Sequence, residues 1–131
     1  MSDAPRHVLT ILAVDDLPAA RRFYAEAFGW PLRVDVPVYA EFALPDGRGV
    51  GLYQRAAFLG NLDAPGAGEV EVTGAELYFL VESLPEASAK LAAAGARLLS
   101  APARRTWGDE VAYYADPLGN VLAVARSGEE R

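Results

Sequence analysis

Hydrophobic and polar positions follow two different periods along the first half of the chain. Residues 7–14 are apolar at most positions on both sides of the chain axis, which predicts a strand that is covered on both faces. Residues 17–28 carry apolar side chains three and four positions apart, which predicts a helix with one buried face. Asp16 is placed to cap this helix, and Gly29 is placed to end it. Three shorter strands are predicted to follow, at residues 32–36, 39–44 and 50–54.

The second half of the chain repeats this order of elements. A strand is predicted at residues 75–81 and a helix at residues 84–94. Ser83 and Glu86 have the spacing of a capping box at the start of that helix, and Gly95 follows its end. Three more strands are predicted at residues 97–100, 110–115 and 121–126.

Short sequence segments repeat together with the elements. Leu17-Pro18 recurs as Leu84-Pro85, which lies 67 positions later, and the turn that contains Gly47 recurs around Gly119, which lies 72 positions later. Self-similarity of this kind predicts two copies of one βαβββ module. We therefore expect one domain over residues 1–131, with module 1 at about 5–56, a connector at 57–74 and module 2 at about 75–127. Residues 60–74 are rich in glycine, proline and acidic side chains, so we expect them to form a surface connector and the least ordered part of the chain.

Composition narrows the classes of function. The chain has 131 residues and no cysteine, which excludes a disulfide, a thiolate zinc site and a thiol nucleophile. Its net charge of -6 without a basic cluster disfavours nucleic acid as a partner. No apolar run approaches the roughly 18 residues of a membrane span, and the first residues lack a secretion signal pattern. We therefore expect a cytoplasmic protein without a membrane partner, which binds a neutral or cationic small molecule.

Two sets of residues resemble the vicinal oxygen chelate superfamily, which includes glyoxalase I, bleomycin-resistance proteins, fosfomycin-resistance enzymes and extradiol dioxygenases. The first set is Val14-x-Asp16-Leu17 with Phe23-Tyr24 and Phe28-Gly29, and the second is Trp107-Gly108 followed by Tyr114-x-Asp116-Pro117-x-Gly119-Asn120. The resemblance covers almost the whole chain. It implies an α+β fold in which two βαβββ modules form a curled mixed sheet around a cavity. Family members are commonly dimers, so the resemblance also implies a homodimer.

In metal-using members of this family, four ligands come from the first and last strand of each module. The resemblance places these positions at Leu9, Gly51, Glu76 and Ala123, and the internal repeat relates the first to the third and the second to the fourth. Three of the four side chains cannot bind a metal ion, and one carboxylate falls short of the three or four donors that a divalent cation needs. We therefore expect neither a metal nor another cofactor, and we assign no catalytic residue.

Residues of one strand parity are expected to line the cavity. Together with Trp107 of the loop at 101–109, they would give the cavity aromatic walls and two carboxylates, which suit a planar or cationic ligand. The predicted ligand-binding residues are Leu9, Glu41, Tyr53, Glu76, Tyr78, Trp107 and Tyr113. The leading prediction is a small-molecule-binding protein similar to the bleomycin-resistance group.

Several alternatives stay open at this point. Glu76 either lies on the cavity wall or points into water from the rim of its strand. His7 is two residues from Leu9, so a shift in register would place it near a carboxylate as a metal candidate, although an exposed position at the strand start is preferred. Arg104 and Arg105 are expected to be solvated loop charges rather than an anion clamp. The aromatic side chains could also fill the cavity themselves.

Two alternative functions accompany these structural alternatives. One is an enzyme of the lyase or isomerase kind that uses Glu76 or Glu41 as a base, with or without a metal. The other is a structural or regulatory protein whose cavity is collapsed.

Overall fold

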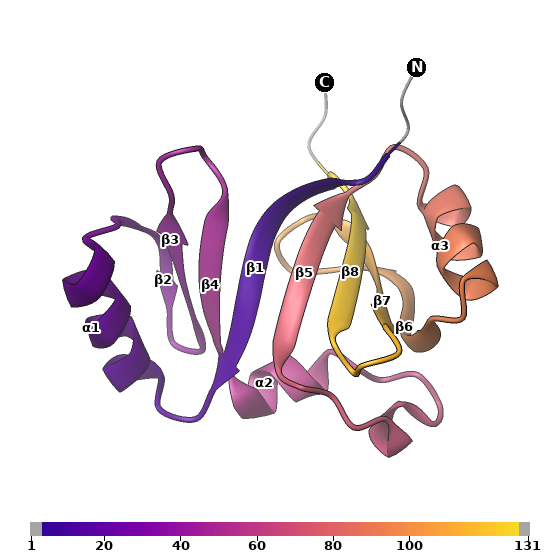
Figure 1. Ribbon diagram of the computed structural model, residues 1–131, viewed down its shortest axis with the longest axis horizontal. Coiled ribbons are helices and arrows are strands. Elements are labelled where there is room, and N and C mark those ends of the chain that lie inside the picture. Colours follow the sequence, from indigo (N-terminus) through magenta and orange to yellow (C-terminus); the bar gives the residue numbers. More distant parts are fainter. Residues whose placement is uncertain (1–3, 129–131) are drawn as a thin grey trace.

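The two halves of the chain fold into two copies of the same module, joined edge to edge (Figure 1). The computed structural model describes residues 4–128. Module 1 comprises β1 (Arg6–Val14), α1 (Leu17–Phe28), β2 (Leu32–Val36), β3 (Tyr39–Ala43) and β4 (Gly49–Gln54). Module 2 comprises β5 (Ala75–Leu80), α3 (Leu84–Ala93), β6 (Arg97–Arg104), β7 (Glu110–Ala115) and β8 (Val121–Arg126). Between them lie α2 (Arg55–Gly60) and the 3-10 turn η1 (Ala67–Glu69).

All eight strands belong to one curled mixed sheet in the order β2-β3-β4-β1-β5-β8-β7-β6. The two modules meet where β1 and β5 run antiparallel at the centre of the sheet (Figure 1). Within each module the first strand is parallel to the last, β1 to β4 and β5 to β8. The sheet does not close, because β2 and β6 remain its two edges. The predicted α+β fold of paired βαβββ modules is confirmed.

Both main helices begin where their caps were predicted. The Asp16 side chain accepts a hydrogen bond from the Ala19 backbone N–H, and Ser83 accepts one from that of Glu86. Each bond satisfies one of the backbone N–H groups that have no partner inside a helix. Gly29 ends α1 with a positive φ of 71°, a conformation that costs glycine little. Local sequence therefore sets these helix ends.

Each helix covers the outer face of its own module. Under α1, Leu17 packs with Phe42 and Leu52, all of them buried. Under α3, Leu84 packs with Tyr114 and Val124. Because side chains alternate along a strand, the neighbouring residues of these strands point to the opposite, inner face of the sheet.

The connector between the modules packs several of its apolar side chains against that inner face. Phe58 of α2 is buried in the inner core, and apolar connector residues pack around it. These residues are Leu62, Ala64, Ala67, Val70 and Val72. The backbone N–H of Ala64 also donates to the Leu99 carbonyl of β6. These apolar residues therefore contact the inner face although their spacing has no regular period, while many of their neighbours in the connector stay exposed.

Strand β6 is longer than predicted and shortens the loop that follows it. It continues to Arg104, where the sequence suggested an end near Ser100. Two register shifts against β7 let it pass its proline and still pair Ala103 with Val111. Sequence periodicity misses a strand whose alternation is interrupted in this way.

The described residues also bear on the expectation about membranes. No helix within residues 4–128 is both long and apolar enough to cross a bilayer.

Candidate functional site

The register of the sheet brings the predicted ligand-binding strand residues together on the inner face. Along one line across the sheet, Glu41 lies opposite Gly51, Gly51 opposite Ile11, and Ile11 opposite Glu76. A second line joins Leu9 to Tyr78, Tyr78 to Ala123 and Ala123 to Tyr113. Leu9 and Tyr53 pack against the same core. The inner face therefore collects residues from both modules.

Glu76 is the most unusual residue on this face. Its side chain is almost completely buried, with 2% of its surface exposed. It forms no hydrogen bond or ion pair within residues 4–128, although a buried carboxyl group without a partner is costly. Burial raises the pKa of Glu76 to about 8, and the nearby positive charge of Arg105 offsets only part of this rise. The alternative in which Glu76 points into water is therefore wrong.

Arg105 enters the same region from the loop between β6 and β7. Its guanidinium lies over the ring of Tyr113, 5.1 Å from the centroid. Its Nη2 donates to Ser100 Oγ (2.7 Å), and Ser100 in turn donates to an Asp63 carboxylate oxygen (2.7 Å). The Nε of Arg105 is buried and has no hydrogen-bond partner in the described part of the chain.

The expectation of a solvated loop charge is therefore wrong for Arg105, whereas Arg104 is exposed to solvent but belongs to the end of β6. Arg104 is exposed and donates to the backbone carbonyl of Gly108. The two residues are adjacent, so sequence alone could not tell which one turns toward the sheet.

Trp107 joins the inner face at its edge through a hydrogen bond. Its indole Nε1 donates to Tyr78 Oη (2.8 Å), and Tyr78 donates to an Asp109 carboxylate oxygen (2.7 Å). Burial, reinforced by Asp109, raises the pKa of Tyr78. Because 46% of the Trp107 surface stays exposed, this side chain lies between the interior and the solvent.

Tyr39 is an inner-face residue that sequence reasoning missed. Its hydroxyl donates to Glu41, which also accepts a hydrogen bond from the Nε of Arg33. A Cβ atom at Gly51 would lie 2.3 Å from the Tyr39 hydroxyl, and one at Gly49 would lie 2.3 Å from the Arg33 guanidinium. The alternating glycines of β4 thus leave the space in which both side chains lie. The alternation of glycines in the sequence was the signal that could have indicated space for these side chains.

Aromatic side chains fill part of the inner face on the module 1 side. The ring of Tyr53 lies 5.1 Å from that of Tyr39 and 6.2 Å from that of Phe58, with edge-on geometry in both pairs. Asn61 of the connector donates to the Tyr53 hydroxyl. On this side the aromatics therefore contact one another, as the collapsed-cavity alternative expects. Glu76 and the Nε of Arg105, which have no hydrogen-bond partner within residues 4–128, belong to module 2.

His7 does not share a face with Leu9. A bulge between the two residues pairs His7 with Phe79 and Leu9 with Tyr78. The imidazole consequently lies against the Phe79 ring of the outer core, with its Nε2 3.0 Å from Thr10 Oγ1. This placement separates His7 from the inner-face carboxylates and rules out the metal site proposed for a shifted register.

The donor set does not fit the metal centre that the fold family implies. Of the four positions Leu9, Gly51, Glu76 and Ala123, only Glu76 carries a side chain that can bind a metal ion. Within residues 4–128, no three His, Asp or Glu side chains gather closely enough to hold one. We derive no chemical step through a metal.

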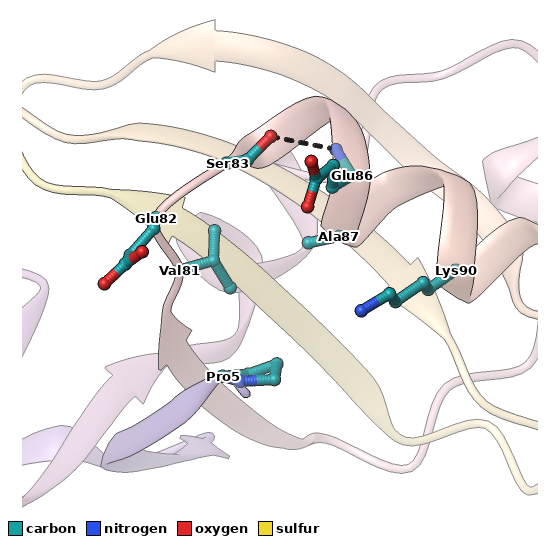
Figure 2. Close-up of a pocket in the computed structure, with 7 residues that line it drawn as sticks. All are labelled: Pro5, Val81, Glu82, Ser83, Glu86, Ala87 and Lys90. Carbon is teal, nitrogen blue, oxygen red and sulfur yellow. Dashed lines mark hydrogen bonds between the residues drawn. The ribbon is translucent and has the colours of Figure 1, made fainter. Parts of the chain in front are cut away.

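A pocket lies away from the inner face, at the start of α3 (Figure 2). It has a volume of about 280 Å³ and includes the Ser83 side chain that caps the helix. The residues that line it are Pro5, Val81, Glu82, Ser83, Glu86, Ala87 and Lys90. None of them is a predicted ligand-binding residue, so the pocket is separate from the candidate site.

Comparison with solved structures shows the same architecture in proteins of low sequence identity. A glyoxalase/bleomycin resistance protein/dioxygenase superfamily member from Vibrio splendidus 12B01 is 16% identical, with a TM-score of 0.64, and the match covers 94% of this chain and 98% of that one. A hypothetical protein from Bacillus halodurans C-125 is 16% identical, with a TM-score of 0.69, and the match covers 98% of each chain. Methylmalonyl-CoA epimerase from Mycobacterium tuberculosis is 19% identical, with a TM-score of 0.62, and the match covers 95% of this chain and 88% of that one. At these identities the likeness concerns the fold alone.

Sequence comparison extends this result to the family. No curated protein sequence matches the chain with statistical significance. The family model described as Glyoxalase/Bleomycin resistance protein/Dioxygenase superfamily matches residues 5–124. With nearly its whole length matched and the paired-module fold in place, the chain belongs to the glyoxalase/bleomycin resistance protein/dioxygenase superfamily.

Proposed function

We propose that this chain binds a small planar organic molecule on the inner face of its sheet, beside Glu76 and Arg105, without a metal. The observation that carries the proposal is the buried Glu76 carboxyl group, which has no hydrogen-bond partner within residues 4–128. Protein interiors seldom keep such a group unless it serves a site. A ligand that pairs with it would recover the hydrogen bonds that folding removes.

The surroundings of Glu76 support a planar ligand more than a cationic one. Tyr113 lies close to both Glu76 and Arg105, and its buried ring offers a flat apolar surface. The guanidinium of Arg105 already places a positive charge on this face, and it would repel a second one. We therefore retain the planar character of the predicted ligand and drop the cationic character.

The test compares two neighbouring tyrosines that lie on opposite faces of β7. Tyr113 faces inward and is 1% exposed, whereas Tyr114 packs under α3 and is 7% exposed. For a planar compound found by a thermal-shift screen of the wild type, Tyr113→Leu should weaken binding about tenfold or more, because it removes a stacking surface. Tyr114→Leu removes the same atoms from the other face and should leave the affinity unchanged. Isothermal titration calorimetry measures both.

Two outcomes of this test would count against the proposal. One is a broad screen of planar compounds without a hit. The other is an equal loss of affinity in the two variants, because a general loss of stability would then explain the effect.

A second candidate function is an enzyme of the lyase or isomerase kind that uses Glu76 as a base. Glu76 favours it because a pKa of about 8 leaves a carboxylate basic enough to remove a proton near neutral pH. Glu41 is a weaker candidate, since it already accepts hydrogen bonds from Tyr39 and Arg33.

The enzyme would catalyse exchange of a carbon-bound hydrogen next to a carbonyl group of a small acid or ketone. In deuterated buffer the rate should rise with pH through about 8, as Glu76 ionises, and should fall at least about 100-fold in Glu76→Gln. Proton NMR of the substrates follows the exchange. If Glu76→Gln and the wild type exchange at the same rate, Glu76 is not the base.

We also propose that the protein forms a homodimer and is cytoplasmic. Support for the dimer comes from apolar side chains of α1, β2 and the turn after β2 that stay at least 40% exposed within residues 4–128. These are Phe23, Phe28, Leu32, Val36 and Val38. Support for the location comes from the absence of cysteine, since the chain needs no oxidising compartment.

A further inference from the structure

Arg105 is a partly buried arginine without an ion pair among residues 4–128. Five other arginines within residues 4–128 each have a carboxylate within 4.0 Å. These are Arg21, Arg33, Arg48, Arg55 and Arg97. A guanidinium stays charged at every physiological pH, so withdrawing it from water is favourable only with compensation. The protein supplies part of it through the Tyr113 ring and Ser100.

The contacts of Arg105 fix its orientation and leave its Nε without a hydrogen-bond partner within residues 4–128. Stacking on Tyr113 sets the plane of the guanidinium, and the bond from Nη2 to Ser100 Oγ holds one corner. Asp63 orients Ser100, because it accepts the hydrogen bond of the serine hydroxyl and leaves the Ser100 oxygen to accept from Arg105. The buried Nε is left without an acceptor.

Glu76 reaches the same inner face from β5, and its side chain is 2% exposed. The two groups interact electrostatically, but they form no ion pair within residues 4–128. With a pKa of about 8, Glu76 is mainly protonated at neutral pH and offers a hydrogen-bond donor of its own. A ligand group that reached both side chains would therefore meet a donor from each.

We infer that Arg105 and Glu76 together form a subsite for a carboxylate group, and that the ligand of the inner face is a planar organic acid. This inference rests on the proposed function and narrows it to one class of ligand. A carboxylate accepts from Arg105 with one oxygen and from Glu76 with the other, and its planar shape matches the guanidinium edge. A doubly charged anion fits less well, because one cation cannot balance it in a chain of net charge -6.

The experiment measures the affinity of the full chain for three compounds of the same ring size. They are 2-naphthoate, the neutral 2-naphthamide and the cationic 2-naphthamidine, titrated calorimetrically at pH 7. A charge-assisted hydrogen bond contributes about 1.5–3 kcal/mol, so the acid should bind about 10- to 100-fold more tightly than the amide. The amidine should bind no better than the amide.

Matched variants then separate Arg105 from general charge effects. Arg105→Gln should remove the preference for the acid over the amide, whereas Arg104→Gln makes the same change of charge one residue away and should keep it. Arg105→Lys retains a cation with a different hydrogen-bond geometry and should show a reduced preference. Circular dichroism of each variant confirms that it is folded, and Arg105→Lys provides the test if Arg105→Gln does not fold.

The outcomes distinguish this inference from the function on which it rests. If the amide binds as tightly as the acid, or if Arg105→Gln keeps the preference, the carboxylate subsite is wrong while planar-ligand binding stands. If none of the three compounds binds, the subsite is wrong for this ring size, and the wider screen of planar compounds decides the proposed function. Preferential binding of the acid that depends on Arg105 and not on Arg104 supports both.

Discussion

Replacing Glu76 by glutamine should leave stability nearly unchanged below pH 4.5 and raise it by up to about 5 kcal/mol at pH 9. Burial raises the pKa of Glu76 from 4.5 to about 8, so between these values the folded protein holds a proton that the unfolded chain has released. The contribution of protonated Glu76 is therefore fully present below pH 4.5 and is lost as pH rises through 8. Glutamine cannot ionise and avoids this loss. Urea unfolding at pH 5, 7 and 9 measures the difference.

The control for this prediction is Glu82→Gln. Glu82 is an exposed glutamate just before α3, and its replacement changes the net charge by the same amount. The stability difference between Glu82→Gln and the wild type should stay nearly constant from pH 5 to pH 9. A Glu76→Gln variant whose advantage does not grow with pH would show that Glu76 is hydrated or paired in solution.

The second large effect concerns Phe58, the residue that fixes the connector to the inner face. Phe58→Ala should lower the free energy of unfolding by about 3–5 kcal/mol, because it removes a fully buried aromatic ring and leaves a cavity. Phe58 is 1% exposed, whereas the next residue, Leu59, is 44% exposed. Leu59→Ala should therefore cost less than about 1 kcal/mol. Chemical denaturation of the two variants gives the comparison.

Hydrogen exchange adds a readout that a general loss of stability would not produce. The backbone amide of Ala64 donates a hydrogen bond to the Leu99 carbonyl. In Phe58→Ala, the exchange rate of this amide should rise more than the exchange rates of the amides within the strands of the sheet. Equal costs for Phe58→Ala and Leu59→Ala would mean that the connector does not cover the inner face in solution.

The placement of the connector matters for the proposed site. Asp63 lies within it and accepts the hydrogen bond from Ser100, which in turn holds Arg105. Docking of the connector through Phe58 therefore orients the guanidinium proposed to bind the ligand. This link joins the stability of one segment to the geometry of the site.

Local sequence was sufficient for most of the elements. The helix caps Asp16 and Ser83 satisfy backbone N–H groups only a few residues away, so they act in the same way wherever the helix lies. Strand parity and the internal repeat, together with the family resemblance, placed Glu76, Tyr78 and Tyr113 on one face. These predictions hold because hydrogen bonding and side-chain alternation depend on neighbours along the chain.

Other features depend on contacts between distant segments. A bulge against β5 turns His7 to the outer face, although its spacing from Leu9 suggested the inner one. Arg105 turns inward because its guanidinium donates to Ser100 and packs on Tyr113, whereas the side chain of Arg104 stays exposed. Neither the face of His7 nor the inward turn of Arg105 can be predicted from hydrophobic periodicity or from a sequence motif.

The order of strands and helices, the start of each main helix and the face on which most strand residues lie were thus determined by the sequence alone, because short-range geometry controls them. Tertiary structure decided how deeply Glu76 is buried, where the connector packs and which arginine reaches the inner face. These properties depend on which surfaces are still accessible to water after all segments have packed. Exclusion of water is a property of the whole molecule, so no local pattern predicts it.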